Sequence, residues 1–269
     1  MKTLVAWGKV HLLNWHKVFR LAEFDKKAMH QNHFFGLFWE FLSPALQIII
    51  YYLVFGLRLG GHAALPSGVP YLYWMLIGII PWFYMSSSIV SGAASIYSNL
   101  GLLSKTAFPV EILPTIAVIK GLNSFFTMLG LFLIVYIGSG FYPTLEWLQL
   151  IYYFFLTVLF LMTISLFTSV LTVIFRDFQL IINSAMRLLF FVSGAVIDVT
   201  ANENSILTKL FKLNPFVYLV EGFRDALLSR EWFFEKTWWT IYFFSVMLLI
   251  LLLGIYLMGR YKSEFTEYM

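Results

Sequence analysis

Long apolar segments alternate with short polar segments along most of the chain. A membrane-crossing helix needs about 20 consecutive apolar residues, because a helix rises about 1.5 Å per residue and the hydrocarbon core is about 30 Å thick. Alternation typical of the strands of a membrane β-barrel is not visible. The pattern predicts an all-α membrane domain over residues 34–258, with six transmembrane helices near residues 34–57, 69–97, 112–138, 147–175, 178–197 and 238–258.

The composition also indicates a membrane protein. Hydrophobic residues make up 60% of the chain and charged residues 12%, and the mean hydropathy is +0.81. This balance leaves too little polar surface for a water-soluble domain. The chain has no cysteine, which excludes a disulfide framework and a thiolate metal site. The net charge of +4 is modest, and we expect no nucleic-acid partner.

Positive charge gathers in the segments that share one side of the membrane with the amino terminus. The basic residues on that side are Lys2, Lys9, Lys17, Arg20, Lys26, Lys27, Lys105, Arg176, Arg260 and Lys262. The opposite side has Arg58 in the first break and none in residues 139–146. Segment 198–237 carries further basic residues, but it is long and contains acids that offset them. The positive-inside rule therefore predicts a multi-pass plasma membrane protein with both termini, including the tail 259–269, in the cytoplasm.

Residues 1–33 have the pattern of an amphipathic helix rather than of a signal peptide. At 100° per residue, one face is basic and the other is apolar with Leu4, Trp7, Trp15, Val18 and Leu21. Leu13 and Phe24 fall on the basic face and weaken the pattern. Such a helix is expected to lie in the inner headgroup layer, either as a plain surface anchor or as a docking element for a partner.

Signatures of enzyme chemistry are absent from the sequence. It contains no G-x-x-x-x-G-K-[ST] phosphate loop, no H-E-x-x-H and no G-x-S-x-G, and its histidines lack the spacing of metal ligands. We therefore expect no catalytic residue, no metal site and no cofactor on this chain. Transport, channel formation and scaffolding remain as function classes.

A family resemblance is carried by residues 99–114, which contain the string NLGLLSKTAFPVEILP. The string resembles the N-x-x-L-x-x-K…F-P-x-E-x-L-P signature of the permease subunits of ABC-2 type exporters, particularly those that export cell-surface polysaccharides. The resemblance extends to the amphipathic amino-terminal helix, the six spans, Arg176-Asp177, Asn214-Pro215 and Phe223-Arg224. Within the family, the chain is most similar to the subgroup that exports wall teichoic acid.

The resemblance implies a homodimer of this permease with two copies of a separate ABC ATPase, which binds ATP and Mg. The substrate would be a lipid-linked glycopolymer, moved from the inner to the outer leaflet. Segment 98–111 would then contain the coupling helix that docks on the ATPase, and apolar residues in it need a cover of protein or lipid. The alternative is a turn buried in headgroups. The candidate coupling residues are Asn99, Leu100, Leu103, Lys105, Phe108, Pro109 and Glu111.

Three charged residues, Glu40, Lys120 and Arg187, lie inside predicted spans. Ionisable groups at that depth are costly and by default mark a functional site. If the substrate is linked to a lipid diphosphate as in the family, Lys120 and Arg187 could bind the diphosphate. The alternative is that Glu40 pairs with one of the two cations while the other extends to the interface.

Aromatic residues are candidates for a path along which sugar rings slide. The alternative is an interfacial belt near the ends of the spans. Ser87, Ser91 and Ser95 share one helix stripe at intervals of four residues, which favours close helix packing over substrate contact. The first two predicted spans offer Phe38, Trp39, Phe41, Tyr71, Tyr73, Trp74, Trp82, Phe83 and Tyr84, of which Tyr71, Tyr73, Trp74 and Tyr84 are the candidates for lining the path.

Segment 198–237 is too long for a turn and contains two apolar pieces that are each too short to span. Residues 206–213 and 216–228 therefore suit re-entrant or interfacial helices on the outer side, hinged at Asn214-Pro215. In the resembling family this region forms an outer gate; the alternative is a cap that only stabilises the fold. The candidate gate residues are Asn214, Pro215, Glu221, Arg224 and Asp225.

The function predicted from these features is that of the transmembrane subunit of an ATP-driven exporter for a lipid-linked polymer, with wall teichoic acid as the polymer. Two alternatives remain. One is an ABC-2 exporter of drugs or lipids, and the other is an energy-independent membrane channel or scaffold.

Overall fold

The computed structural model describes residues 2–30, 38–51, 53–54, 69–103, 108–198, 206–263 and 265. Within these residues the regular elements are α-helices and short 3-10 helices, which confirms the predicted all-α class. The α-helices are α1 (Lys2–His30), α2 (Trp39–Tyr51), α3 (Tyr71–Ala94), α4 (Leu100–Leu103), α5 (Leu113–Gly138), α6 (Gln149–Ile174), α7 (Phe178–Val192), α8 (Ile206–Lys212), α9 (Pro215–Leu227) and α10 (Thr237–Tyr261). The 3-10 helices are η3 (Tyr97–Asn99), η4 (Val110–Ile112) and η5 (Leu145–Leu148).

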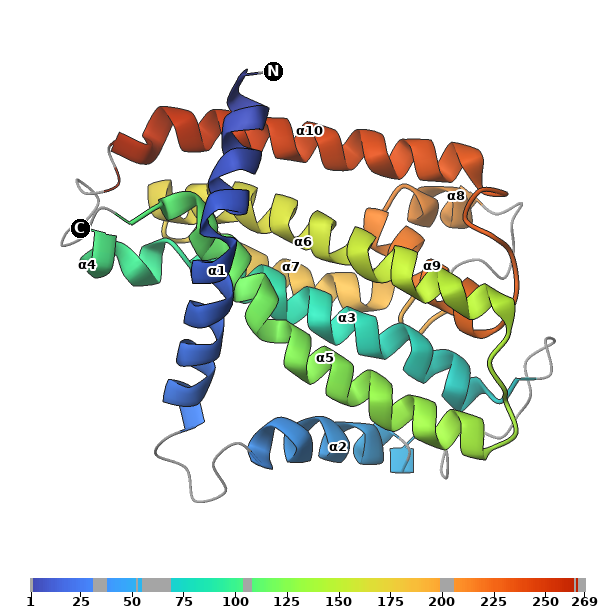
Figure 1. The fold of residues 1–269 in the computed structure, drawn as a ribbon. Coiled ribbons are helices and arrows are strands. Elements are labelled where there is room, and N and C mark those ends of the chain that lie inside the picture. Colours follow the sequence, from blue (N-terminus) through green and yellow to red (C-terminus); the bar gives the residue numbers. More distant parts are fainter. Residues whose placement is uncertain are drawn as a thin grey trace.

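The long helices α3, α5, α6 and α10 form a bundle (Figure 1). Helix α3 packs against both α5 and α6, and α10 packs along α6. Within the described residues, four helical segments are long and apolar enough to cross a membrane, namely Tyr71–Ala94, Val110–Gly138, Leu145–Ile174 and Thr237–Tyr261. Helix α10 exposes side chains such as Leu249, which is 60% exposed, as suits contact with lipid. The chain is a multi-pass membrane protein.

The predicted first and fifth spans coincide with shorter helices. Helix α2 has 13 residues and α7 has 15, so each covers roughly 20 Å at the rise of an α-helix, less than the hydrocarbon core. Helix α7 ends before Gly194, whose φ of 78° marks a turn. Residues 31–37 and 55–68, which complete the first predicted span and its break, lie outside the described residues. The crossings by α2 and α7 stay predictions.

Helix α1 runs across the long helices rather than alongside them, and it lies at the same end of the bundle as α4 (Figure 1). We call this end the α4 end, and the opposite end, near α8 and α9, the α9 end. Part of the apolar face of α1 packs on protein, because Val18 and Ala22 are buried while Trp15 on the same face is 44% exposed; α1 contacts α5, η4 and α10. The amphipathic pattern of the sequence therefore corresponds to a helix that docks on the bundle.

The buried side chains form two hydrophobic cores. The larger core joins α3, α5, α6 and α9 around residues such as Trp82, Phe160 and Phe216. The second core lies at the α4 end and combines side chains from six segments of the chain: Val18, Ala22, Ile96, Leu100, Val110, Ile112, Leu113, Ile116, Ile119, Leu166, Val170, Val173, Met258 and Phe265. The second core therefore unites α1, the predicted coupling segment and the residues after α10.

Candidate functional site

Those predicted coupling residues that the structure describes lie at the α4 end. Leu100 is 6% exposed and belongs to the second core, against which Phe108 packs. The Asn99 amide donates a hydrogen bond to the carbonyl oxygen of Ser95 at 2.8 Å, and the Pro109 carbonyl accepts the first bond of η4. Lys105 and the side chain of Leu103 lie outside the described residues.

Glu111 is a junction between the coupling segment and the chain after α10. Its Oε1 accepts a hydrogen bond from Lys262 Nζ at 2.6 Å. One turn after Glu111, Thr115 contacts α1 through His11. The His11 Nδ1–H donates a hydrogen bond to the Trp7 carbonyl at 3.0 Å. Nε2 therefore accepts a hydrogen bond from the Thr115 hydroxyl at 2.9 Å. Burial lowers the pKa of His11 below its ordinary value near 6.5. The neutral imidazole thus joins α1 to α5.

A cavity of about 600 Å³ with a mixed lining of polar and apolar side chains lies between α1, α2, α3 and α5, toward the α4 end. We call it the serine cavity. Its two charged groups are Lys120 of α5 and Asp25 of α1, with Nζ and Oδ2 3.8 Å apart. The side chain of Glu40, the predicted alternative partner, lies outside the described residues. The polar uncharged residues of the lining are Ser43, Ser87, Ser88, Ser91, Ser95, Ser98, Asn99, Asn123 and Ser124.

The serines interpreted from sequence as a packing stripe therefore line a cavity. Ser91 donates its hydroxyl hydrogen to the Ser87 carbonyl at 2.7 Å, and Ser95 donates to the Gly92 carbonyl at 2.6 Å. A hydroxyl that already donates can still accept. These serines thus offer acceptors to a ligand that carries hydroxyl groups, while the Lys120 ammonium offers a cation. Asn123 and Ser124 of α5 also line the cavity; as polar residues within an apolar segment, close to Lys120, they are the sequence signal that could have indicated it.

Arg187 lies in a different cavity from Lys120. A groove of about 500 Å³, here called the aromatic groove, runs between α3 and α7 and is lined by Arg187 together with Trp82, Phe83 and Phe190. The rings of Phe83 and Phe190 are nearly parallel, with an interplanar angle of 6°. The two cations that the sequence suggested for one binding site are thus kept in separate places.

The aromatic candidates for the path are engaged in packing. Trp74 and Tyr84 are 1% and 3% exposed, while the hydroxyl of Tyr71 donates to the Val196 carbonyl at 2.7 Å. The Tyr73 hydroxyl lies 2.6 Å from that of Ser139. These four residues pack within the bundle in this conformation, whereas Trp82 and Phe83 of the same predicted span line the aromatic groove.

At the α9 end, α9 is inserted into the bundle with Phe216 to Leu227 all buried. Asn214 caps the helix by accepting from the Phe216 N–H at 3.1 Å, and Pro215 occupies its first turn. Arg224 is 0% exposed. Its guanidinium binds Glu221 at 2.6 Å and donates to the carbonyls of Trp74 at 3.2 Å and Ala195 at 3.0 Å.

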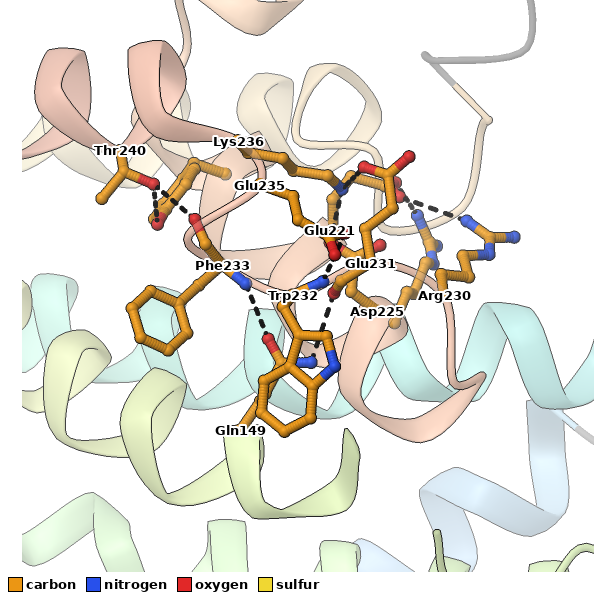
Figure 2. Close-up of polar contacts among 12 residues, drawn as sticks. Gln149, Glu221, Asp225, Arg230, Glu231, Trp232, Phe233, Glu235, Lys236 and Thr240 are labelled. Atoms are coloured by element: carbon orange, nitrogen blue, oxygen red, sulfur yellow. Dashed lines mark hydrogen bonds and ion pairs between the residues drawn. The ribbon is translucent and has the colours of Figure 1, made fainter. Parts of the chain in front are cut away.

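Further ion pairs connect α9 to the loop before α10. Figure 2 shows Lys236 between Asp225, at 2.6 Å, and Glu231, at 3.5 Å. Arg230 lies 3.7 Å from the second oxygen of Glu221. Burial raises the pKa of the Asp225 carboxyl to about 6, and the Lys236 ammonium opposes that rise. Of the predicted gate residues, Glu221, Arg224 and Asp225 take part in these ion pairs, and Glu221 and Asp225 border a cavity of about 910 Å³. Asn214 and Pro215 begin the helix that carries them.

Comparison with known proteins identifies the family. A family model for ABC-2 type transporters matches residues 17–228. The chain belongs to the ABC-2 type transporter family. This permease is 28% identical over 213 residues to the O-antigen export system permease protein RfbA of Myxococcus xanthus, covering 78% of this chain and 80% of that protein.

Two further relatives have related names. An O-antigen export system permease protein RfbA of Klebsiella pneumoniae is 24% identical to this chain over 247 residues, which cover 90% of this chain and 91% of that protein. The polysialic acid transport protein KpsM of Escherichia coli is 24% identical over 194 residues, which cover 72% of this chain and 74% of that protein. The predicted resemblance to ABC-2 permeases of polysaccharide export is confirmed. The assignment to wall teichoic acid stays a prediction.

Replacing Gly78 by alanine should destabilise the protein. A Cβ at Gly78 would lie 2.5 Å from Arg224 Nη2 and 2.8 Å from the Ala195 carbonyl oxygen, and overpacking of this kind costs about 1–3 kcal/mol. We expect a lower apparent melting temperature in detergent. Gly130→Ala is the matched control in α5, because a Cβ there meets nothing within 4 Å. Equal melting temperatures for the two variants would contradict the packing described for Arg224.

The docking of α1 should weaken at acidic pH. The pKa of His11 is lower in the folded protein than in the free helix, so the folded state binds fewer protons, and stability present above about pH 6.5 is lost as pH falls. Amide hydrogen exchange of residues 7–25, corrected for intrinsic rates, should show lower protection at pH 5.5 than at pH 7.5. His11→Gln should remove most of this difference, and an unchanged pH response in that variant would assign it to another group.

Proposed function

We propose that this chain is the transmembrane subunit of an ATP-driven exporter that moves a lipid-linked cell-surface polymer from the inner to the outer leaflet. The observation that carries the proposal is the serine cavity, a chamber whose wall contains several serines and Lys120, located at the same end as the coupling segment. The family membership and the names of the polysaccharide-exporting relatives support the substrate class.

The distribution of charge supports a cytoplasmic location for the α4 end. Exposed Lys9, Lys17 and Arg20 lie on α1, and Arg176 and Lys262 follow α6 and α10 at the same end. The positive-inside rule assigns such an end to the cytoplasm. Both chain termini would then be cytoplasmic, and crossings by α2 and α7 would complete six spans.

The energy source would be a separate subunit. The sequence has no phosphate loop, so ATP and Mg would be bound by an ABC ATPase, in two copies beside a homodimer of this chain. The coupling segment 98–111 would contact that ATPase. Leu100 of this segment is buried in the second core. A displacement of the segment would therefore be transmitted to α1, α6 and α10 through packed side chains.

The chemistry of the two cavities suits different parts of a lipid-linked polymer. Lys120 and the hydroxyl acceptors of the serine cavity suit a phosphate and the hydroxyls next to it. The aromatic groove offers rings for the apolar C–H faces of sugars and Arg187 for a second anionic group. A lipid-linked polysaccharide is the broader proposal. Wall teichoic acid, a polyol phosphate, is the narrower one, and it rests on the similarity of the chain to that subgroup within the family.

The first test is purification of the tagged chain from its native host in mild detergent, followed by identification and stoichiometry of what accompanies it. We expect an ABC ATPase in equal amount to this chain, as two copies of each in the complex. A homo-oligomer without any ATPase in several mild detergents would overturn the exporter proposal and favour the channel or scaffold alternative.

Lys120→Ala should reduce export without loss of assembly. The substitution removes the cation of the serine cavity, and a hydrogen bond to a charged group contributes about 1.5–3 kcal/mol, so we expect a loss of about tenfold or more at limiting substrate. Transport of lipid-linked polymer into reconstituted vesicles measures it. Lys120→Arg should retain most activity, and Lys9→Ala, which removes an exposed charge on α1, is the control. Normal export by Lys120→Ala would exclude a substrate role for this cavity.

A further inference from the structure

The chain after α10 returns to the coupling segment and is fixed there at two points. Lys262 Nζ lies 2.6 Å from Glu111 Oε1, across 151 residues of sequence. Three residues after Lys262, Phe265 is 2% exposed and belongs to the second core together with Leu100 and Val110. We call Lys262 and Phe265 the tail anchor. The tail anchor thus joins the chain after α10 to Leu100 near the start of the coupling segment and to Val110 and Glu111 at its end.

The two contacts of the tail anchor differ in what they supply. The side chains of Lys262 and Glu111 are 46% and 16% exposed, and an ion pair with that much solvent contact adds little stability. Phe265 buries a large apolar surface, which stabilises the docked tail substantially. The aromatic ring therefore holds the tail in place, and the ion pair fixes its position relative to η4.

Glu111 depends on Lys262 for compensation of its charge. Its second carboxylate oxygen, Oε2, is buried and accepts no hydrogen bond from the described residues. Among the described residues, Lys262 is the cation that forms an ion pair with the Glu111 carboxylate. Loss or reversal of the Lys262 charge would leave a largely buried carboxylate without its partner, which favours a shift of η4 toward solvent.

We propose that the tail anchor is a positioning element of the coupling segment. The Lys262–Glu111 pair and Phe265 hold η4 and the start of α5 against the end of α10, so that a displacement of residues 98–111 moves α5 and α10 together. The role in coupling rests on the proposed function. It also assigns Glu111 an intramolecular partner, in place of the direct ATPase contact that the family resemblance suggests.

A charge swap separates these two roles of Glu111. In the reconstituted complex of full-length chain and ATPase, Glu111→Lys and Lys262→Glu should each lower the amount of polymer exported per ATP hydrolysed by up to about fivefold, the upper range for a partly exposed ion pair. The double variant restores the pair with reversed charges and should recover most of that ratio. A double variant no better than Glu111→Lys would overturn the proposal and indicate that Glu111 acts on the ATPase.

Three further variants control for charge and for packing. Arg260→Glu reverses an exposed charge two residues before Lys262, on a guanidinium that lies over the Tyr261 ring rather than on Glu111, and it should leave the export ratio unchanged. Phe265→Ala should lower the ratio as Lys262→Glu does, and Phe265→Leu should retain it. An Arg260→Glu effect equal to that of Lys262→Glu would overturn the proposal, because the effect would then be one of net charge at the tail.

Hydrogen exchange of the isolated permease distinguishes failure of the anchor from failure of the proposed function. Lys262→Glu should lower amide protection in residues 110–116, and the double variant should restore it, with no ATPase present. Unchanged protection in both Lys262→Glu and Glu111→Lys would overturn the anchor itself. If protection responds as expected but no ATPase accompanies the chain in purification, the proposed function and the coupling role fail while the anchor remains.

Discussion

The buried guanidinium of Arg224 is the interaction on which the α9 end depends. The side chain is inaccessible to solvent and lies 3.4 Å above the Trp74 ring, with hydrogen bonds to Glu221 and to two backbone carbonyls from separate segments. A buried charge is tolerated only when its hydrogen bonds are made, and removal of one partner typically costs about 3–5 kcal/mol. Gly78 is required at its position because the guanidinium occupies the space of a side chain there. One residue thus fixes α9 to α3 and to the turn after α7.

Much of the fold could be predicted from the sequence, because long apolar segments have one stable form in a bilayer. The spans expected at 69–97, 112–138, 147–175 and 238–258 correspond to α3, α5, α6 and α10 within a few residues. The environment of α1 could not be predicted. Periodicity shows which face of a helix is apolar, but not whether lipid or protein covers it, and here Val18 and Ala22 are covered by the bundle.

The candidate site was predictable only for residues that are unusual in their own segment. Lys120 is visible in the sequence as a cation within an apolar segment, and the structure places it in the wall of a cavity. Its neighbour Asp25 belongs to α1 and could not be connected to it by spacing. Glu111 was noticeable through the family string, but its pairing with Lys262 spans 151 residues and exists only because α10 returns to the α4 end. Pairings across helices depend on the tertiary arrangement, which one sequence does not contain.

The two ends of the bundle differ in how readily their ionic contacts can break. At the α4 end, Lys120 and Asp25 are 32% and 51% exposed, so water can replace either partner at little cost. At the α9 end, Glu221 and Arg224 are 4% and 0% exposed, and their separation would leave charges in an apolar environment. A conformational change that opens the α9 end is therefore expected to move α9 and α3 as one body. The α4 end, with its more exposed ion pair between Lys120 and Asp25, is where rearrangement costs least.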